Sequence, residues 1–197
     1  NYQNSTGLIF CLSRNDTEQL ADLLLQKNYK AAFYHADMTG KERTRVQQQW
    51  TRGIVKIVVA TVAFGMGIDK PDVRFVIHHS IAKSLEGYYQ ESGRAGRDGK
   101  TSHCLVLYSH GDHSRIMKLI SKVDGQYKDQ QRISIERDLL NSMMQYANEK
   151  IQCRRVVILK YFGEDFKPDN CNRMCDVCCR KSEGNLSIST INVTQHA

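Results

Sequence analysis

Residues 7–61 have the sequence GLIFCLSRNDTEQLADLLLQKNYKAAFYHADMTGKERTRVQQQWTRGIVKIVVAT, in which short apolar runs alternate with helical patterns. Aromatic and β-branched residues favour strands, and they are concentrated in GLIFCL (7–12), AAFYH (31–35) and KIVVAT (56–61). Helices are predicted between these runs, at 15–27 and 39–52. Strands that alternate with helices of about 10–15 residues indicate a parallel sheet with helices on both faces.

Polar residues mark the ends of both predicted helices. Asn15 is the expected cap of the first helix, with Glu18 three residues later. Thr39 and Glu42 have the spacing of a capping box at the start of the second helix, and Gly53 is suited to end it. The two helices therefore have the length expected of crossovers between parallel strands.

The alternation continues to about residue 110 and then changes character. Two more strands are predicted from VRFVIH (73–78) and HCLVLY (103–108). Helical patterns follow at 112–123, 133–149 and 153–162. We therefore predict three parts: an α/β domain at 1–115, a small helical module with cysteines at 116–181, and a polar, disordered tail at 182–197.

The composition excludes several classes of protein. The 197 residues are 41% hydrophobic and include only 13 Gly and 2 Pro, which is unlike a collagen or a low-complexity chain. No apolar run approaches the roughly 18 residues that a membrane helix needs, so we expect no membrane partner. The 28 Lys and Arg exceed the 21 Asp and Glu by 7. This positive charge is compatible with a nucleic-acid partner but does not by itself establish one.

The cysteines indicate a metal site. Cys153, Cys171, Cys175 and Cys178 are separated by 17, 3 and 2 residues, and Cys179 is an alternative to its neighbour. A C-x3-C-x2-C segment can direct its thiolates toward one point, where a distant fourth cysteine completes a tetrahedron. Four thiolates with no open position are typical of structural Zn²⁺, and the alternative is a group of reduced, buried cysteines.

Two further stretches have the features of a ligand site. ATVAFGMGIDKPDVRFVIH (60–78) follows a buried strand, and Gly65 and Gly67 flank a loop from which Asp69 is expected to project into the crevice where α/β sheets bind ligands. YYQESGRAGRDG (88–99) contains Arg94 and Arg97, each preceded by glycine. Glycine lets the backbone approach a ligand closely, and guanidinium groups are good hydrogen-bond donors to phosphate oxygens. Arg94 and Arg97 can therefore both bind one triphosphate.

Taken together, these stretches resemble the RecQ family of DNA helicases. The similarity also includes IFCLSR (9–14), YHAD (34–37) and the cysteine module, runs in order from about residue 7 to 180, and is closest to eukaryotic members. It implies a second RecA-like motor lobe followed by a RecQ zinc-binding subdomain. It also implies an ATP-driven motor that moves 3′ to 5′ on DNA, in the nucleus, with repair and recombination partners.

The resemblance assigns roles to individual residues. It implies that Arg97 is the arginine finger facing the γ-phosphate, with Arg94 beside it and Gln90 linking nucleotide state to domain closure. Gly67 and Asp69 fall in the motif that couples the nucleotide cleft to the DNA track. Contacts to the DNA backbone are implied for Ser13, Arg14, His35, Thr61, Ser80, Lys83 and Ser84.

The loop after residue 34 contains one departure from the family pattern. A histidine that ends a strand is often only a surface side chain, but the YHA context of His35 favours a DNA contact. The family usually has a small residue after YHA, whereas this chain has Asp37. A carboxylate at that position would repel a nearby phosphate.

Two elements of a complete nucleotide site are missing from the sequence. There is no G-x-x-x-x-G-K-[ST] motif and no Asp-Glu pair after a strand that could hold Mg²⁺. We therefore expect ATP and Mg²⁺ to be shared with a first RecA-like lobe on a preceding segment. On this interpretation the 197-residue chain alone hydrolyses ATP negligibly and binds DNA weakly.

Two other functions are compatible with these motifs. A related RNA helicase lobe can contain a similar GRxGR loop, although the cysteine module and the sequence QESGRAGRDG favour the RecQ family. A zinc-stabilised DNA-binding or interaction module with inert motor motifs is the other. Replacement of Arg97 distinguishes the inert module from a motor.

Overall fold

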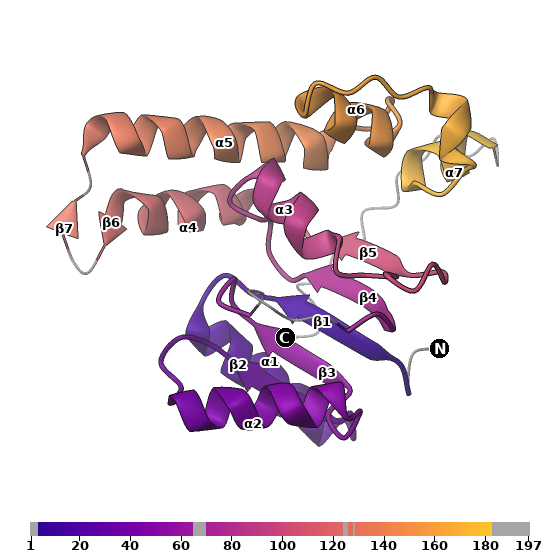
Figure 1. The fold of residues 1–197 in the computed structure, drawn as a ribbon. Coiled ribbons are helices and arrows are strands. Elements are labelled where there is room, and N and C mark those ends of the chain that lie inside the picture. Colours follow the sequence, from indigo (N-terminus) through magenta and orange to yellow (C-terminus); the bar gives the residue numbers. More distant parts are fainter. Residues whose placement is uncertain (1–3, 65–69, 124–125, 128, 183–197) are drawn as a thin grey trace. The chain divides into compact units, whose positions relative to one another are not determined.

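In the computed structural model, five parallel strands form one sheet in the order β2-β3-β1-β4-β5 (Figure 1). The structure describes residues 4–64, 70–123, 126–127 and 129–182. The strands are β1 (Thr6–Phe10), β2 (Ala31–Tyr34), β3 (Ile57–Ala60), β4 (Val73–His78) and β5 (His103–Val106). All five were predicted from the sequence, as was the α/β class.

Helices cover both faces of the sheet. α1 (Arg14–Gln26) places Ala21 against a core that includes Ile9 of β1 and Val59 of β3. α2 (Gly40–Thr51) places Trp50 on the opposite face, and α3 (Leu85–Ser92) lies between β4 and β5 in the chain. Because successive strand residues point to opposite faces, the near-continuous apolar strands supply both cores.

The helix caps were predicted correctly in one case and wrongly in the other. Thr39 and Glu42 form the expected capping box of α2. The cap of α1 is Ser13 rather than Asn15, because Ser13 has an extended backbone and its Oγ accepts a hydrogen bond from the Asp16 backbone N–H. Asn15 is therefore inside the first turn of α1.

A helical hairpin follows the sheet. α4 (His110–Ser121) leads through the short antiparallel strands β6 (Lys122–Val123) and β7 (Gln126–Tyr127) to α5 (Gln130–Asn148). The strand pair was not predicted. Ile116 of α4 and Met143 of α5 are fully buried, and Tyr146 of α5 packs against Tyr88 of α3 with 5.3 Å between ring centroids.

The chain divides into two compact units, residues 1–147 and 148–197. The second unit contains α6 (Arg154–Tyr161), the 3₁₀ helix η1 (Pro168–Cys171) and α7 (Asp176–Ser182). The first compact unit contains α4 and most of α5 together with the sheet. The sequence analysis instead assigned most of both helices to the module with the cysteines. The functional boundary at 115/116 stays a prediction, and the predicted tail at 182–197 lies almost wholly outside the described residues.

Among the described residues, no helix combines the length and the apolar character needed to cross a membrane.

Candidate functional site

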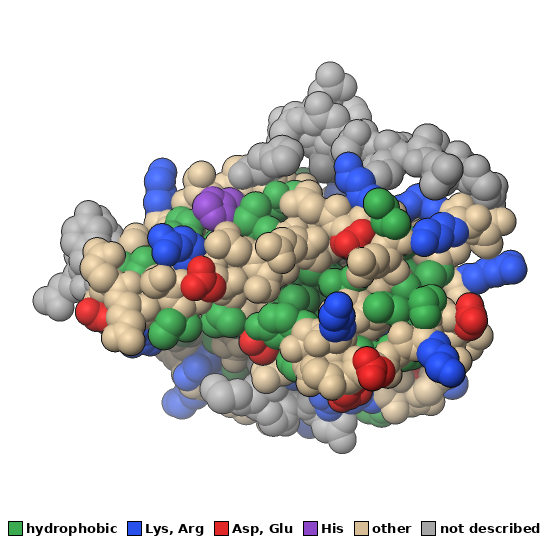
Figure 2. Space-filling view, turned by 90° about the horizontal axis from the view of Figure 1, so that it is seen from above, with side chains coloured by type: hydrophobic (Ala, Val, Ile, Leu, Met, Phe, Trp, Pro, Cys, Tyr) green, Lys and Arg blue, Asp and Glu red, His purple; other side chains and the backbone are tan. Residues whose placement is uncertain are grey.

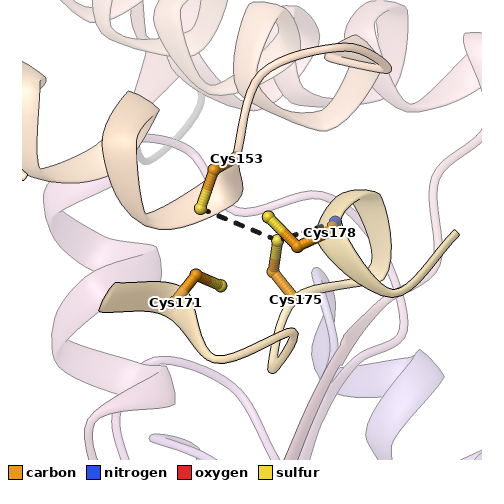
Figure 3. Close-up of side chains that lie close together, drawn as sticks. All are labelled: Cys153, Cys171, Cys175 and Cys178. Carbon is orange, nitrogen blue, oxygen red and sulfur yellow. Dashed lines mark hydrogen bonds between the residues drawn. The ribbon is translucent and has the colours of Figure 1, made fainter. Parts of the chain in front are cut away.

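Four cysteine side chains from the second unit converge on one point (Figure 3). Cys153 immediately precedes α6, Cys171 ends η1, and Cys175 and Cys178 come from the start of α7. Their sulfur atoms all lie within 4.8 Å of one another. Cys179, the alternative left open by the sequence, is outside this group.

The spacing of the sulfurs suits a tetrahedral metal ion. Four thiolates at about 2.3 Å from one Zn²⁺ ion would be about 3.8 Å apart from each other. The Sγ atoms of Cys175 and Cys153 are 3.8 Å apart. A set of merely buried cysteines has no reason to adopt this arrangement, so the geometry favours a closed, structural metal site over the alternative of reduced cysteines.

The thiols of the group differ in acidity. For Cys175, burial alone would raise the pKa, but hydrogen bonds from the backbone N–H groups of Cys178 and Arg154 lower it to about 7. Burial raises the pKa of both Cys171 and Cys178. Without a metal, the group would therefore hold protons that a bound cation must displace.

An ion-pair network that the sequence did not reveal holds the metal-site elements together. Arg154 of α6 donates two hydrogen bonds to Asp176 of α7, Nε to Oδ1 at 2.9 Å and Nη2 to Oδ2 at 3.2 Å. Arg180 donates a third to Asp176 Oδ2 at 2.9 Å. Because Arg154 follows Cys153 and Asp176 follows Cys175, the bidentate pair orients two of the four sulfur-bearing segments.

The two predicted nucleotide-contacting arginines lie at the amino edge of the sheet. Their loop follows α3, and its Gly96 N–H donates to the carbonyl of Val73, the first residue of β4, at 2.9 Å. Asp98 accepts a hydrogen bond at 2.5 Å from Arg74, also at the start of β4. The hydrogen bond from Arg74 lowers the pKa of Asp98. The loop is therefore fixed to β4 on both sides of Arg97.

Arg94 and Arg97 approach the same place in the first unit. Both line a narrow cavity of about 10 Å³ together with Trp50 and Lys70. Arg94 is half-buried and Arg97 is exposed. Burial, and then the neighbouring Arg97 guanidinium, lower the pKa of Arg94. The two guanidinium groups repel each other, and an anion bound between them would reduce this electrostatic repulsion.

Lys70 stabilises the base of this cavity, and the sequence did not indicate it. Its Nζ lies 5.6 Å from the centre of the Trp50 ring and 3.0 Å from Asp72, and it donates to the Thr51 carbonyl at 3.3 Å. A cation–π contact in so dry a place contributes about 1–2 kcal/mol. Gly67 and Asp69, which the sequence placed in the coupling motif, lie outside the described residues.

We expect Gly96→Ala to destabilise the arginine loop. Gly96 has a φ of +65°, and a Cβ there would lie 2.5 Å from Ser102 Oγ and 2.9 Å from the Lys100 carbonyl. The left-handed backbone and the collision together should lower the free energy of unfolding by about 2–4 kcal/mol. Urea denaturation followed by fluorescence measures this, because Trp50 is the only tryptophan and is fully buried.

Gly99→Ala is the matched control. Gly99 also has a positive φ, +76°, but a Cβ added there would have no atom within 4 Å. The substitution should cost only the backbone strain, about 1–2 kcal/mol. Equal losses in the two variants would contradict the collision at Gly96.

The residues implied in DNA binding gather at the opposite, carboxyl edge of the sheet. Each of them follows one of four parallel strands, β1 to β4, in the chain. Arg14 and Lys83 are exposed, whereas Thr61 is half-buried. Thr61, Ser80, Lys83 and Ser84 line one hollow of about 100 Å³. The structure therefore brings most of this set together.

Two serines of the set cap helices that begin at this edge. Ser13 caps α1, and Ser84 caps α3 by accepting a hydrogen bond from the Gly87 backbone N–H at 3.1 Å. Helix amino termini favour anions, although Asp16 and Glu86 in the first turns oppose this effect. The serine hydroxyls thus support the helix ends in addition to any ligand contact.

Two members of the set, His35 and Ser80, are buried. His35 is only 4% exposed and its Nε2 lies 2.9 Å from Glu18 Oε1. Ser80 is 6% exposed. Ser80 lines the hollow at the carboxyl edge, whereas the His35 ring is paired with Glu18 of α1. Their contact with DNA stays a prediction.

Asp37 pairs with a cation of the same edge. Its Oδ2 accepts a hydrogen bond from Arg14 Nη1 at 2.6 Å. Both side chains are more than half exposed, so the pair is weak and the guanidinium can exchange Asp37 for a phosphate. The Asp37 carboxylate therefore competes with a phosphate for Arg14. Its negative charge is balanced by the Arg14 guanidinium while the two are paired.

A buried pair of side chains lies beside the hollow at the carboxyl edge. His78, at the end of β4, is 2.7 Å from Glu91 Oε2 through its Nε2. Glu91 directly follows Gln90, which is exposed on α3. α3 therefore begins at the hollow, and the loop that follows it continues to the amino edge, where Gly96 bonds to Val73. The His78–Glu91 contact fixes α3 to the sheet.

Charges of both signs are mixed on the face of the molecule that Figure 2 shows. On the face shown in Figure 2, Lys and Arg side chains are interspersed with acidic and hydrophobic ones and do not form a single patch. The net charge of +7 therefore does not by itself locate a binding surface.

Comparison with known proteins bears on both units. Residues 1–99 match the family described as the helicase conserved C-terminal domain, and residues 110–179 match the RecQ zinc-binding family. The structure resembles a DEAD-box protein of Methanococcus jannaschii with a TM-score of 0.52 and 27% identity, covering 59% of this chain and 32% of that one. The fold is also similar to that of E. coli SrmB bound to regulator of ribonuclease activity A, with a TM-score of 0.51, 23% identity and coverage of 66% and 78%.

Relatives of known sequence are similar over almost the whole chain. ATP-dependent DNA helicase hus2/rqh1 of Schizosaccharomyces pombe is 50% identical over 91% of this chain and 13% of its own length. Mouse ATP-dependent DNA helicase Q1 is 45% identical over 99% and 28%, and the RecQ-like DNA helicase BLM of Xenopus laevis is 44% identical over 98% and 14%. The chain thus spans less than a third of the length of these relatives.

The fold and the matches define a helicase C-terminal lobe followed by a zinc-binding segment. The chain belongs to the RecQ family of helicases.

Proposed function

We propose that this chain is the second motor lobe and zinc-binding segment of an ATP-dependent DNA helicase that moves 3′ to 5′. A first RecA-like lobe in the same polypeptide would supply the phosphate-binding half of the nucleotide site, and the combination is called the two-lobed protein below. The relatives named above, which are DNA helicases, support this proposal. By the same likeness we propose a nuclear protein with repair and recombination partners.

The observation that carries the proposal is the separation of two sets of side chains on one sheet. Arg94 and Arg97 lie at the amino edge, and the exposed Arg14 and Lys83 lie at the carboxyl edge. α3 and the arginine loop that follows it join the two edges, and α3 is tied to β4 through Glu91. A lobe that must respond to nucleotide and also hold a DNA strand needs such an arrangement.

The roles of the residues at the amino edge follow from their charge. Phosphoryl transfer concentrates negative charge on the γ-phosphate oxygens, and ATP with Mg²⁺ would bring that charge to the cleft. Arg97 would stabilise it, Arg94 would hold the triphosphate, and Gln90 would sense closure from the exposed face of α3. Because the arginines come from a different lobe than the phosphate-binding loop, hydrolysis would depend on closure of the two lobes.

In the second unit, we propose that Cys153, Cys171, Cys175 and Cys178 hold Zn²⁺. A bound zinc ion would supply structural cross-links and no catalysis, since four thiolates leave no open position. The Arg154–Asp176 pair would keep the loops of the site in register before the metal binds.

The proposal as a whole is tested by strand separation. The two-lobed protein should separate a forked DNA duplex only in the presence of ATP and Mg²⁺, and more readily than a matched RNA fork. A preference for RNA, or ATP-independent strand separation, would contradict it.

Lys83→Ala should weaken binding to single-stranded DNA without a sequence preference. Loss of one phosphate contact makes the slope of log affinity against log salt concentration shallower by about 0.7. Fluorescence anisotropy of a labelled oligothymidine, measured with the two-lobed protein from low to moderate salt, gives this slope. Lys100→Ala is the control, because Lys100 is exposed at the amino edge and should leave the slope unchanged.

A further inference from the structure

A buried carboxylate of α4 reaches the loop at the carboxyl edge. Asp112 is 5% exposed, and its Oδ2 accepts a hydrogen bond from the Ile81 backbone N–H at 3.2 Å. The same carboxylate accepts from the backbone N–H and the hydroxyl of Ser109, at 3.4 and 3.0 Å. Ile81 and Asp112 are 31 positions apart, so this contact ties α4 to the loop between β4 and α3.

The hydrogen bond from Ile81 to Asp112 lies in the middle of residues 79–84, the segment that carries Lys83. At one end of this segment, the His79 N–H donates to the Phe10 carbonyl at 2.8 Å. At the other end, Ser84 caps α3. Ile81 itself is 1% exposed, and its backbone N–H points to Asp112. A hydrogen bond to a buried carboxylate is about twice as strong as a neutral one, so Asp112 restrains the loop at the point farthest from its fixed ends.

α4 has a second contact with the same edge. Arg115, one turn after Asp112, donates from Nη2 to Asp16 Oδ2 at 2.9 Å. Asp16 is in the first turn of α1, where its backbone N–H also bonds to Ser13. α4 therefore contacts the first turn of α1, which carries Arg14, and the loop between β4 and α3, which carries Lys83. These two segments follow β1 and β4, which are adjacent strands of the sheet.

We propose that α4 is a brace of the DNA-binding edge and that Asp112 is its positioning residue. This inference rests on the proposed function of the carboxyl edge. α4 lies in the part of the chain that matches the RecQ zinc-binding family, outside the part that matches the helicase C-terminal domain. The brace is thus an addition to the motor lobe, and it holds the residues proposed to contact the DNA strand in position before DNA binds. By holding Lys83 in place, it lowers the entropy lost when DNA binds.

The competing explanation is that Asp112 only stabilises α4. Ser109 precedes α4, and Asp112 accepts hydrogen bonds from its backbone N–H, as in one half of a capping box, and from its hydroxyl. These bonds cap the start of α4. Ser109→Ala weakens this cap but keeps the bond from Asp112 to Ile81. Asp112→Ala removes both. The comparison of the two variants therefore separates the cap from the brace.

The experiment is a DNA titration of ATP hydrolysis by the two-lobed protein. Asp112→Ala should raise the half-saturating concentration of oligothymidine by about tenfold, while kcat at saturating DNA changes by less than about twofold. Asp112→Asn, which keeps the shape and one acceptor oxygen, should shift the same parameter by a smaller factor of about three. Ser109→Ala should leave it within about twofold. Thermal unfolding of each variant shows that the titrated protein is folded.

The outcomes distinguish this inference from the proposed function. An unchanged half-saturating concentration in both Asp112 variants, or an equal rise in Ser109→Ala, overturns the brace. A fall in kcat with no shift in the DNA titration overturns it as well. Lys83→Ala in the same assay tests the edge itself. If Lys83→Ala shifts the titration and the Asp112 variants do not, the brace fails and the DNA-binding edge stands; if none of them shifts it, the edge fails.

Discussion

Replacement of Arg97 by alanine in the two-lobed protein should lower kcat for ATP hydrolysis by about 10³-fold or more. A cation supplied to the γ-phosphate across a cleft contributes roughly 10³–10⁵ to the rate of phosphoryl transfer. Arg97 is exposed at the amino edge, and its loop is fixed by bonds from Gly96 to Val73 and from Arg74 to Asp98. The loop should therefore keep its shape without the guanidinium, and ATP affinity should change by less than about fivefold.

Steady-state ATPase assays and binding of a fluorescent ATP analogue measure the two quantities. Arg45→Ala is a matched control, because Arg45 is an exposed arginine of α2 in the same unit. Arg97→Lys should recover little activity, since lysine lacks the planar, forked guanidinium. Full unwinding by Arg97→Ala would show instead that the motor motifs are inert and that the chain is a zinc-stabilised binding module.

Loss of the metal should unfold the second unit. The binding free energy of a four-thiolate zinc site is on the order of 10 kcal/mol, which exceeds what the short helices of this unit can supply by packing. Among its described residues, only Cys153, Ile158, Cys171 and Val177 are buried apolar side chains. Cys171→Ser, or a strong chelator, should therefore abolish zinc retention and expose residues 148–182 to proteolysis, while Trp50 fluorescence still reports a folded first unit.

Cys179→Ser provides the control for this experiment. Cys179 is adjacent to Cys178 but outside the group of four sulfurs, so the variant should keep one zinc ion per chain by mass spectrometry or elemental analysis. Loss of zinc from Cys179→Ser with retention by Cys178→Ser would reverse the assignment. Zinc affinity should fall as the pH is lowered, because burial raises the pKa of Cys171 and Cys178 and protons then compete with the metal for these thiols.

The parts of the structure that could be predicted are those with local causes. The five strands and the capping box of α2 depend on residues within a few positions of each other, whose preferences act over one turn or one strand. The C-x3-C-x2-C segment is equally local, because its short spacing limits where the thiolates can point. The cap of α1 was assigned to Asn15 instead of Ser13 because both are good capping residues and the end of β1 decides between them.

The sequence by itself determined the α/β class, the five strands of the sheet in chain order, the cysteine set and the resemblance to the family. Only the tertiary structure decided that the arginines lie at the amino edge and the residues implied in DNA binding at the carboxyl edge, that His35 and Ser80 are buried, and that Asp112 bonds to Ile81. The physical reason is the range of the interactions. Patterns of hydrophobicity and capping act between near neighbours, whereas a carboxylate and an N–H 31 positions apart meet only after the sheet and its helices have packed.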